Sequence, residues 1–130
     1  ISKGDLISAF PFPNTIVMTK LKGSQIKKIF DHAAGMTNGI LQVSQNAKYT
    51  FSPGNKVLQI WIKGELINND QDYWVAAPNF VTQGGDGYLE FQNSIEYIDS
   101  GVLIIDEVEN FLKERKLYEP KHEGRVQTVE

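Results

Sequence analysis

The chain contains no cysteine, only two histidines and no cluster of basic residues, and each shortage excludes a class of function. Without cysteine it can form neither a disulfide nor a thiolate metal site. A hydrolytic metal centre needs several ligands that converge on one or two ions, and His32 and His122 belong to no such pattern. The 13 basic and 16 acidic residues are scattered, which argues against binding to nucleic acid or a charged membrane surface. The sequence does not support catalysis or cofactor binding by this chain alone.

Long hydrophobic runs are also missing. No apolar stretch approaches the roughly 20 residues that cross a bilayer, and residues 1–5 lack the basic and apolar regions of a signal peptide. Because the first residue is not methionine, we expect the chain to be a fragment of a longer protein. Its 130 residues, 41% of them hydrophobic, suffice for one domain that buries roughly two-thirds of its unfolded surface.

Short helices and short strands are interspersed along the chain. Helical spacing of apolar residues predicts helices over 5–10, 24–35 and 104–116, with Ser24 as an N-cap and Gly35 as a left-handed C-cap. Strand propensity predicts strands over 15–21, 41–44, 48–51, 56–62, 73–77 and 126–129. The polar residues 68–72 predict a surface turn. Together these elements predict a single α+β domain, with mixed or antiparallel sheets flanked by helices.

The most informative segment is 73–88, in which an apolar strand is followed by a loop with one aromatic residue, three glycines and one carboxylate. These residues are Phe80, Gly84, Gly85, Asp86 and Gly87. Glycine tolerates positive φ and lets the backbone come close to a ligand. Two interpretations stay open, a ligand-holding loop and a tight turn, because Asp-Gly between apolar runs is also a strong turn signal. The Phe80 ring could likewise be part of the core or a stacking platform.

The run from Ala77 to Tyr88, APNFVTQGGDGY, resembles the signature of the 5'-nucleotidase C-terminal domain. Residues 9–12, 15–23, 39–44 and 123–126 are similar to family segments in the same order, so the resemblance covers nearly the whole chain. The family includes periplasmic 5'-nucleotidases, UDP-sugar hydrolases and animal ecto-5'-nucleotidases. In these enzymes an N-terminal metallophosphoesterase domain, which this chain does not contain, uses two divalent metal ions. The resemblance implies that residues 1–130 are the substrate-specificity domain of an extracellular or periplasmic enzyme.

The resemblance also implies roles for individual residues. Phe80 corresponds to an aromatic residue that stacks on the nucleotide base, and Asp86 to the carboxylate that accepts hydrogen bonds from the ribose hydroxyls. The three glycines shape the loop between them. Ile40 takes the place of the second stacking aromatic, so the expected base sandwich is half aliphatic. Gln42 corresponds to an amide near the base edge, with an outward-facing strand residue as the alternative.

Two further features concern the phosphate end of the site. The family segment of the type Asn-Gly-Gly-x-Ile-Arg, which lies near the phosphate, would precede Ile1 and is not in this sequence. Arg125, in a Glu-Gly-Arg run, is interpreted as part of a structural ion pair. The expected partners are therefore a nucleotide or nucleoside and the N-terminal metallophosphoesterase domain of the same polypeptide.

The function that the resemblance implies is base and ribose recognition for a two-metal 5'-nucleotidase. Alternatives are a non-catalytic nucleotide-binding or adhesion module, and a UDP-sugar or 2',3'-cyclic nucleotide hydrolase of the same family.

Overall fold

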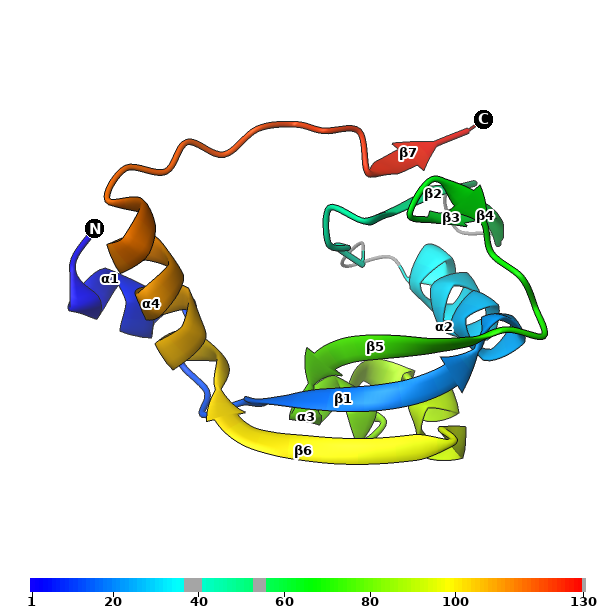
Figure 1. Ribbon diagram of the computed structural model, residues 1–130, viewed down its shortest axis with the longest axis horizontal. Helices are drawn as coiled ribbons and strands as arrows, with labels where there is room; N and C mark the ends of the chain where they lie inside the picture. The colour runs from blue at the N-terminus through cyan, green and yellow to red at the C-terminus, as the bar shows by residue number, and fades with distance from the viewer. Residues whose placement is uncertain (37–40, 53–55, 130) are drawn as a thin grey trace. The chain divides into compact units, whose positions relative to one another are not determined.

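The structure is a computed structural model that describes residues 1–36, 41–52 and 56–129 (Figure 1). Its helices are α1 (Lys3–Ala9), α2 (Gly23–Gly35), α3 (Asn79–Thr82) and α4 (Ile104–Arg115), with 3-10 turns η1 (Gly85–Gly87) and η2 (Leu89–Asn93). The strands are β1 (Thr15–Lys22), β2 (Ala47–Phe51), β3 (Val57–Ile62), β4 (Glu65–Leu66), β5 (Asp72–Pro78), β6 (Glu96–Leu103) and β7 (Val126–Thr128). The predicted α+β class is confirmed. The chain forms two compact units, residues 1–20 with 74–120 and residues 21–73 with 121–130.

The first unit is built on a three-stranded sheet in the order β5-β1-β6 (Figure 1). Strands β1 and β6 are antiparallel, and Thr19 is the register partner of Tyr97. Side chains of partners share a face of the sheet, and the hydroxyl of Tyr97 lies 2.8 Å from that of Thr82 in α3. The short helix α3 therefore packs on the face to which the fully buried Thr19 also belongs.

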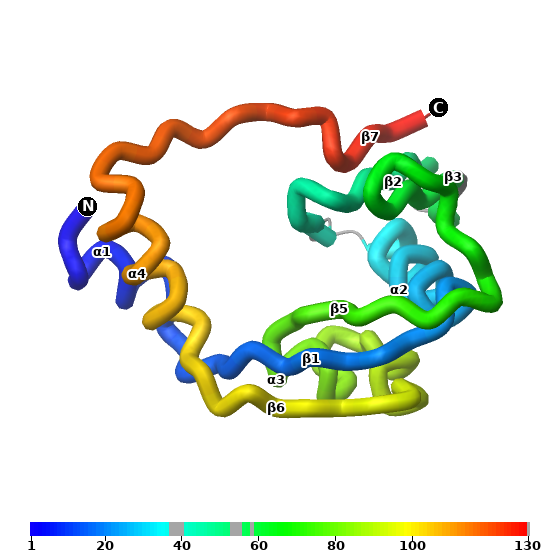
Figure 2. Tube along the Cα trace, in the orientation of Figure 1, coloured from blue at the N-terminus to red at the C-terminus, as the bar shows by residue number. Residues whose placement is uncertain are grey.

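The second unit is a four-stranded sheet in the order β4-β3-β2-β7, covered on one face by α2 (Figure 2). Strand β2 is antiparallel to β3 and parallel to β7. The core of this unit lies between the helix and the sheet, and its buried side chains are Ile26, Ile29, Phe30, Ala33, Ala34, Ala47, Tyr49, Phe51, Val57 and Ile60. The rings of Phe30 and Tyr49 meet edge to face, with centroids 4.9 Å apart, an arrangement that stabilises a pair by about 0.5–1.5 kcal/mol.

The N-terminus of α2 differs from the expectation. The helix begins at Gly23, and Ser24 is not its N-cap. The N–H groups of Gly23 and Ser24 instead donate to the carbonyl oxygens of Gln71 and Asn69, at 2.9 and 3.1 Å. The turn over 68–72 is exposed as predicted, but it also caps this helix. At the other end, Gly35 is the last helical residue and has no positive φ, so the prediction of a left-handed C-cap there is wrong.

Residues 41–44 form no strand, contrary to the expectation. Side chains satisfy two of their carbonyl groups, because the Tyr49 hydroxyl donates to Leu41 O at 2.7 Å and the Arg125 guanidinium donates to Val43 O at 3.0 Å. Arg125 also pairs with Glu123 at 3.2 Å, as the interpretation of a structural ion pair requires. Strands β4 and β6 were not predicted. Among the described residues, no helix is long and apolar enough to span a membrane.

Candidate functional site

Phe80 lies in the short helix α3, where the sequence predicted a loop after the strand. Strand β5 ends at Pro78, which serves as the N-cap of α3. The next residue fixes the helix to β1, because Asn79 Oδ1 accepts a hydrogen bond from Thr15 N–H at 3.1 Å. The Phe80 side chain is 50% exposed. A ring of this size at the surface is available for stacking, so the alternative of a core phenylalanine is wrong.

The last residue of α3 fixes this helix from the opposite side. Thr82 is 1% exposed, and its hydroxyl lies 3.2 Å from Asn79 O and 2.8 Å from the Tyr97 hydroxyl. Buried polar groups are costly unless they are hydrogen-bonded, so this contact favours one position of the helix turn. Asn79 and Thr82 together hold Phe80 on the sheet, and neither was singled out from the sequence because nothing in their spacing marks such a role.

The glycine loop follows directly, and its backbone is left-handed at three positions. The φ angles are 97° at Gly84, 56° at Asp86 and 82° at Gly87. Glycine adopts this conformation readily, and aspartate is one of the few other residues that tolerate it. An aspartate with left-handed backbone angles, between two glycines, is a backbone outlier of the kind that clusters at ligand sites.

Gly85 is needed for a different reason, the close approach of Phe80. A Cβ atom at Gly85 would lie 2.5 Å from the Phe80 carbonyl oxygen and 2.6 Å from Cε1 of its ring. The ring of Phe80 therefore lies directly against the Gly85 backbone. Asp86, the next residue, is also exposed, so the loop carries an exposed aromatic ring and an exposed carboxylate.

Tyr88, two residues after Asp86, has a buried side chain. Burial raises the pKa of the Tyr88 phenol above its ordinary value, and the negative charge of Asp86 raises it further. Both effects disfavour the phenolate. Tyr88 is thus neutral at physiological pH.

The raised pKa of Tyr88 makes the stability of the protein depend on pH. Because the folded-state pKa of Tyr88 is raised, its stabilising contribution is complete below the unfolded-state pKa, near 10, and is lost as the pH rises through the folded-state value. We expect Asp86→Asn to lower the pKa of Tyr88 toward its ordinary value, measured by NMR titration of the tyrosine Cζ resonances. An unchanged pKa in this variant would contradict the electrostatic effect of Asp86 on Tyr88.

The predicted site residues fall into two groups. Phe80, Gly84, Gly85, Asp86 and Gly87 come together in the first unit. Gln42 is exposed and belongs to the second unit, outside any strand, and Ile40 lies outside the described residues.

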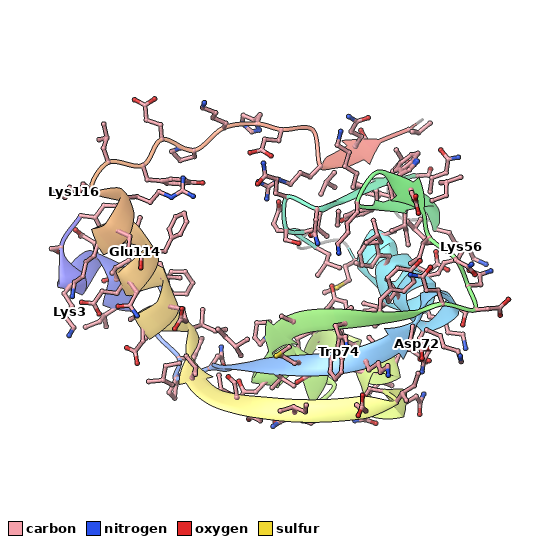
Figure 3. All side chains as sticks on the ribbon, in the orientation of Figure 1. Lys3, Lys56, Asp72, Trp74, Glu114 and Lys116 are labelled. Carbon is pink, nitrogen blue, oxygen red and sulfur yellow. The ribbon has the colours of Figure 1, made fainter. Side chains whose placement is uncertain are left out.

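A second exposed aromatic side chain of the first unit was not singled out from the sequence. Trp74, on β5 (Figure 3), is 49% exposed. Lys20 Nζ lies 5.9 Å from its ring centroid.

Metal ligands do not gather in the described part of the chain. No group of three or more His, Cys, Asp or Glu side chains there could hold a metal ion. Both His32 and His122 are exposed.

Comparison with known proteins agrees with this loop and fold. The family model described as "5'-nucleotidase, C-terminal domain" matches residues 1–93. The chain therefore belongs to the 5'-nucleotidase C-terminal domain family, as the resemblance indicated.

The proteins to which the chain is similar are longer hydrolases. The chain is 33% identical to the trifunctional nucleotide phosphoesterase protein YfkN of Bacillus subtilis, over 99% of this chain and 10% of that protein. It is 31% identical to human 5'-nucleotidase, over 94% of this chain and 24% of the relative. The crystal structure of a 5'-nucleotidase precursor from Thermus thermophilus matches with a TM-score of 0.92 and 28% identity, over 99% of this chain and 28% of that one. The chain thus spans less than a third of each of these proteins.

Proposed function

We propose that this chain binds the base and ribose of a nucleotide as the recognition domain of a two-metal 5'-nucleotidase. The observation that supports the proposal most is the half-exposed Phe80 ring held against Gly85, one residue before the exposed carboxylate of Asp86. A flat hydrophobic face beside a hydrogen-bond acceptor suits a nucleoside, which presents a flat base joined to a sugar with two hydroxyls.

Phe80 supplies the stacking surface in this proposal. Stacking of a base on an aromatic side chain contributes about 1–3 kcal/mol. The helix that carries the ring is already fixed before the ligand arrives, because α3 is hydrogen-bonded to β1 through Asn79 and to β6 through Thr82. Preorganisation of this kind lowers the entropic cost of binding.

Asp86 supplies the polar recognition. Its ionised carboxylate accepts hydrogen bonds from the ribose hydroxyls, and hydrogen bonds to charged groups contribute about 1.5–3 kcal/mol. A site built for hydroxyls rejects ligands without them, because the acceptor, covered by the ligand, would then be left without a partner. Gly84, Gly85 and Gly87 give the loop the backbone angles and the close approach that this geometry requires.

The hydrolytic step is assigned to another part of the full-length protein. In the proposal, a metallophosphoesterase domain of the same polypeptide holds two divalent metal ions that activate water against the phosphate, outside the cytoplasm. This chain contributes affinity and substrate choice, which fits the small share of each relative that it covers. Ile40 is proposed to cover the second face of the base by apolar contact, and Gln42 to lie near the base edge.

The proposal is tested by titrating the 130-residue chain with AMP and adenosine and following the amide resonances. We expect millimolar or tighter binding, with the largest shifts at residues 80–87. Dideoxyadenosine, which lacks both ribose hydroxyls, should bind roughly tenfold or more weakly, because it loses the contacts to Asp86. UDP-glucose and 2',3'-cyclic AMP serve as the alternative ligands, and a clear preference for either would redirect the substrate assignment. Absence of shifts in the loop with every ligand would overturn the proposal.

A further inference from the structure

The outer face of the sheet in the second unit carries a pocket that shares no residue with the glycine loop. Its volume is about 680 Å³, within the usual range for small-molecule sites. The described residues that line it are Gln45, Asn46, Lys48, Tyr49, Thr50, Trp61, Lys63, Gly64, Gly124 and Gln127.

Strand alternation explains how this face is formed. On β2, Ala47, Tyr49 and Phe51 are buried against α2, so the residues between them, Lys48 and Thr50, project from the other face. Lys48 is the register partner of Trp61 on β3, and Thr50 is the partner of Gln127 on β7. The pairing therefore sets an aromatic ring beside a lysine, next to a row of neutral polar groups.

A second lysine reaches the pocket from the hairpin between β3 and β4. Lys63 and Gly64 both have positive φ, 52° and 82°, as a tight two-residue turn between antiparallel strands requires. The turn is fixed by Lys63 N–H, which donates to Asn46 O at 2.7 Å. Lys63 is thereby held in a conformation that residues other than glycine rarely adopt, at the rim of the pocket.

The charge of this pocket is positive, although the whole chain has a net charge of −3. None of the described lining residues is acidic. No ion pair joins Lys48 or Lys63 to a described carboxylate, and the nearby Glu123 is paired with Arg125. Two lysines without an acidic neighbour in the pocket favour an anionic ligand.

We propose that this pocket binds an acidic sugar, with the sugar ring stacked on Trp61 and its anionic group between Lys48 and Lys63. The apolar C–H face of a sugar ring suits an aromatic platform. The neutral polar side chains around it, Gln45, Asn46, Thr50 and Gln127, offer both donors and acceptors to the ring hydroxyls. The anion could be a phosphate or a carboxylate, since a lysine binds either as a point charge.

The chain offers a selective probe, because it has two tryptophans and the second, Trp74, belongs to the other unit. In Trp74→Phe, fluorescence reports on Trp61 alone. We expect glucose 1-phosphate or glucuronate to change this fluorescence saturably, and the stronger of the two identifies the anion. Neutral glucose and inorganic phosphate should each bind at least tenfold more weakly, because glucose lacks the anionic group and inorganic phosphate lacks the sugar ring.

Lysine variants test the charge assignment. Lys48→Gln and Lys63→Gln should each weaken binding at least fivefold, whereas Lys56→Gln, an exposed lysine that does not line the pocket, should not. Chemical shifts of the Trp61 indole in the unsubstituted chain provide a second measurement that does not depend on Trp74→Phe. Excess adenosine, which has no anionic group, should not displace the acidic sugar, so failure here is distinguishable from failure of nucleoside binding at Asp86. No saturable change with either acidic sugar, equal affinity in the lysine variants, or displacement by adenosine would overturn the proposal.

Discussion

Under the proposed function, replacing Asp86 with alanine in the full-length protein is expected to lower kcat/KM for AMP roughly 10- to 100-fold and to spare p-nitrophenyl phosphate. The variant loses hydrogen bonds to a charged acceptor, which contribute about 1.5–3 kcal/mol, and each 1.4 kcal/mol corresponds to a factor of about ten. p-Nitrophenyl phosphate has no ribose, so it makes no use of this contact. Steady-state kinetics with both substrates provide the measurement.

Two companion variants sharpen the result. Asp86→Asn removes the charge but keeps a residue that tolerates the left-handed backbone, so its loss should be smaller than that of Asp86→Ala. Glu107→Ala removes an exposed carboxylate from the first turn of α4 and should leave both substrates unaffected. Phe80→Ala should again affect AMP selectively, through lost stacking. Equal losses on AMP and p-nitrophenyl phosphate would rule out a role for the loop in recognising the nucleoside.

The second large effect is expected at Gly23, for stability and not for activity. A Cβ atom there would lie 2.0 Å from the backbone oxygen of Asn68. The contact is with backbone, so the turn over 68–72 must move, which disrupts the two hydrogen bonds that cap α2. We expect Gly23→Ala to lower the free energy of unfolding by roughly 3 kcal/mol, from overpacking and the lost caps together, measured by urea denaturation of the 130-residue chain.

Gly35→Ala is the matched control, because it makes the same change at the other end of the same helix. No atom lies within 4 Å of a Cβ built at Gly35, and its φ is not positive. Alanine there should raise stability by about 0.5–1 kcal/mol, since it reduces the freedom of the unfolded chain. Similar destabilisation by both substitutions would show that the approach of Asn68 is not what requires glycine at position 23.

Much of the fold could be predicted wherever one face of an element is buried. Helix α2 was predicted from its apolar spacing, and its buried residues include Ile26, Ile29 and Phe30. Strand β6 was missed because nearly all its side chains are exposed, so its sequence carries no alternation. Residues 41–44 have strand propensity but lack a partner strand, and the side chains of Tyr49 and Arg125 bind their carbonyl groups instead. Such long-range contacts are not visible in a local pattern.

The candidate site, too, could be predicted only in part. Phe80 and Asp86 were identified through a motif, but the conformation of their loop depends on backbone angles at Gly84, Asp86 and Gly87 and on the ring of Phe80 lying against Gly85. Spacing could not distinguish this arrangement from a simple turn. The residues that hold the helix, Asn79 and Thr82, act through partners in β1 and β6 that are distant in sequence. Their role becomes evident only from three-dimensional contacts.

The parallel pairing of β7 with β2 has a consequence for synthesis of the protein on the ribosome. Tyr49 pairs with Val126, and all of residues 74–120, which belong to the first unit, are translated between these two strands. During that interval β2 has one unpaired edge, and such edges recruit strands of other chains. While residues 74–120 are translated, the nascent second unit is therefore prone to aggregation. We expect holdase chaperones to bind it at this stage.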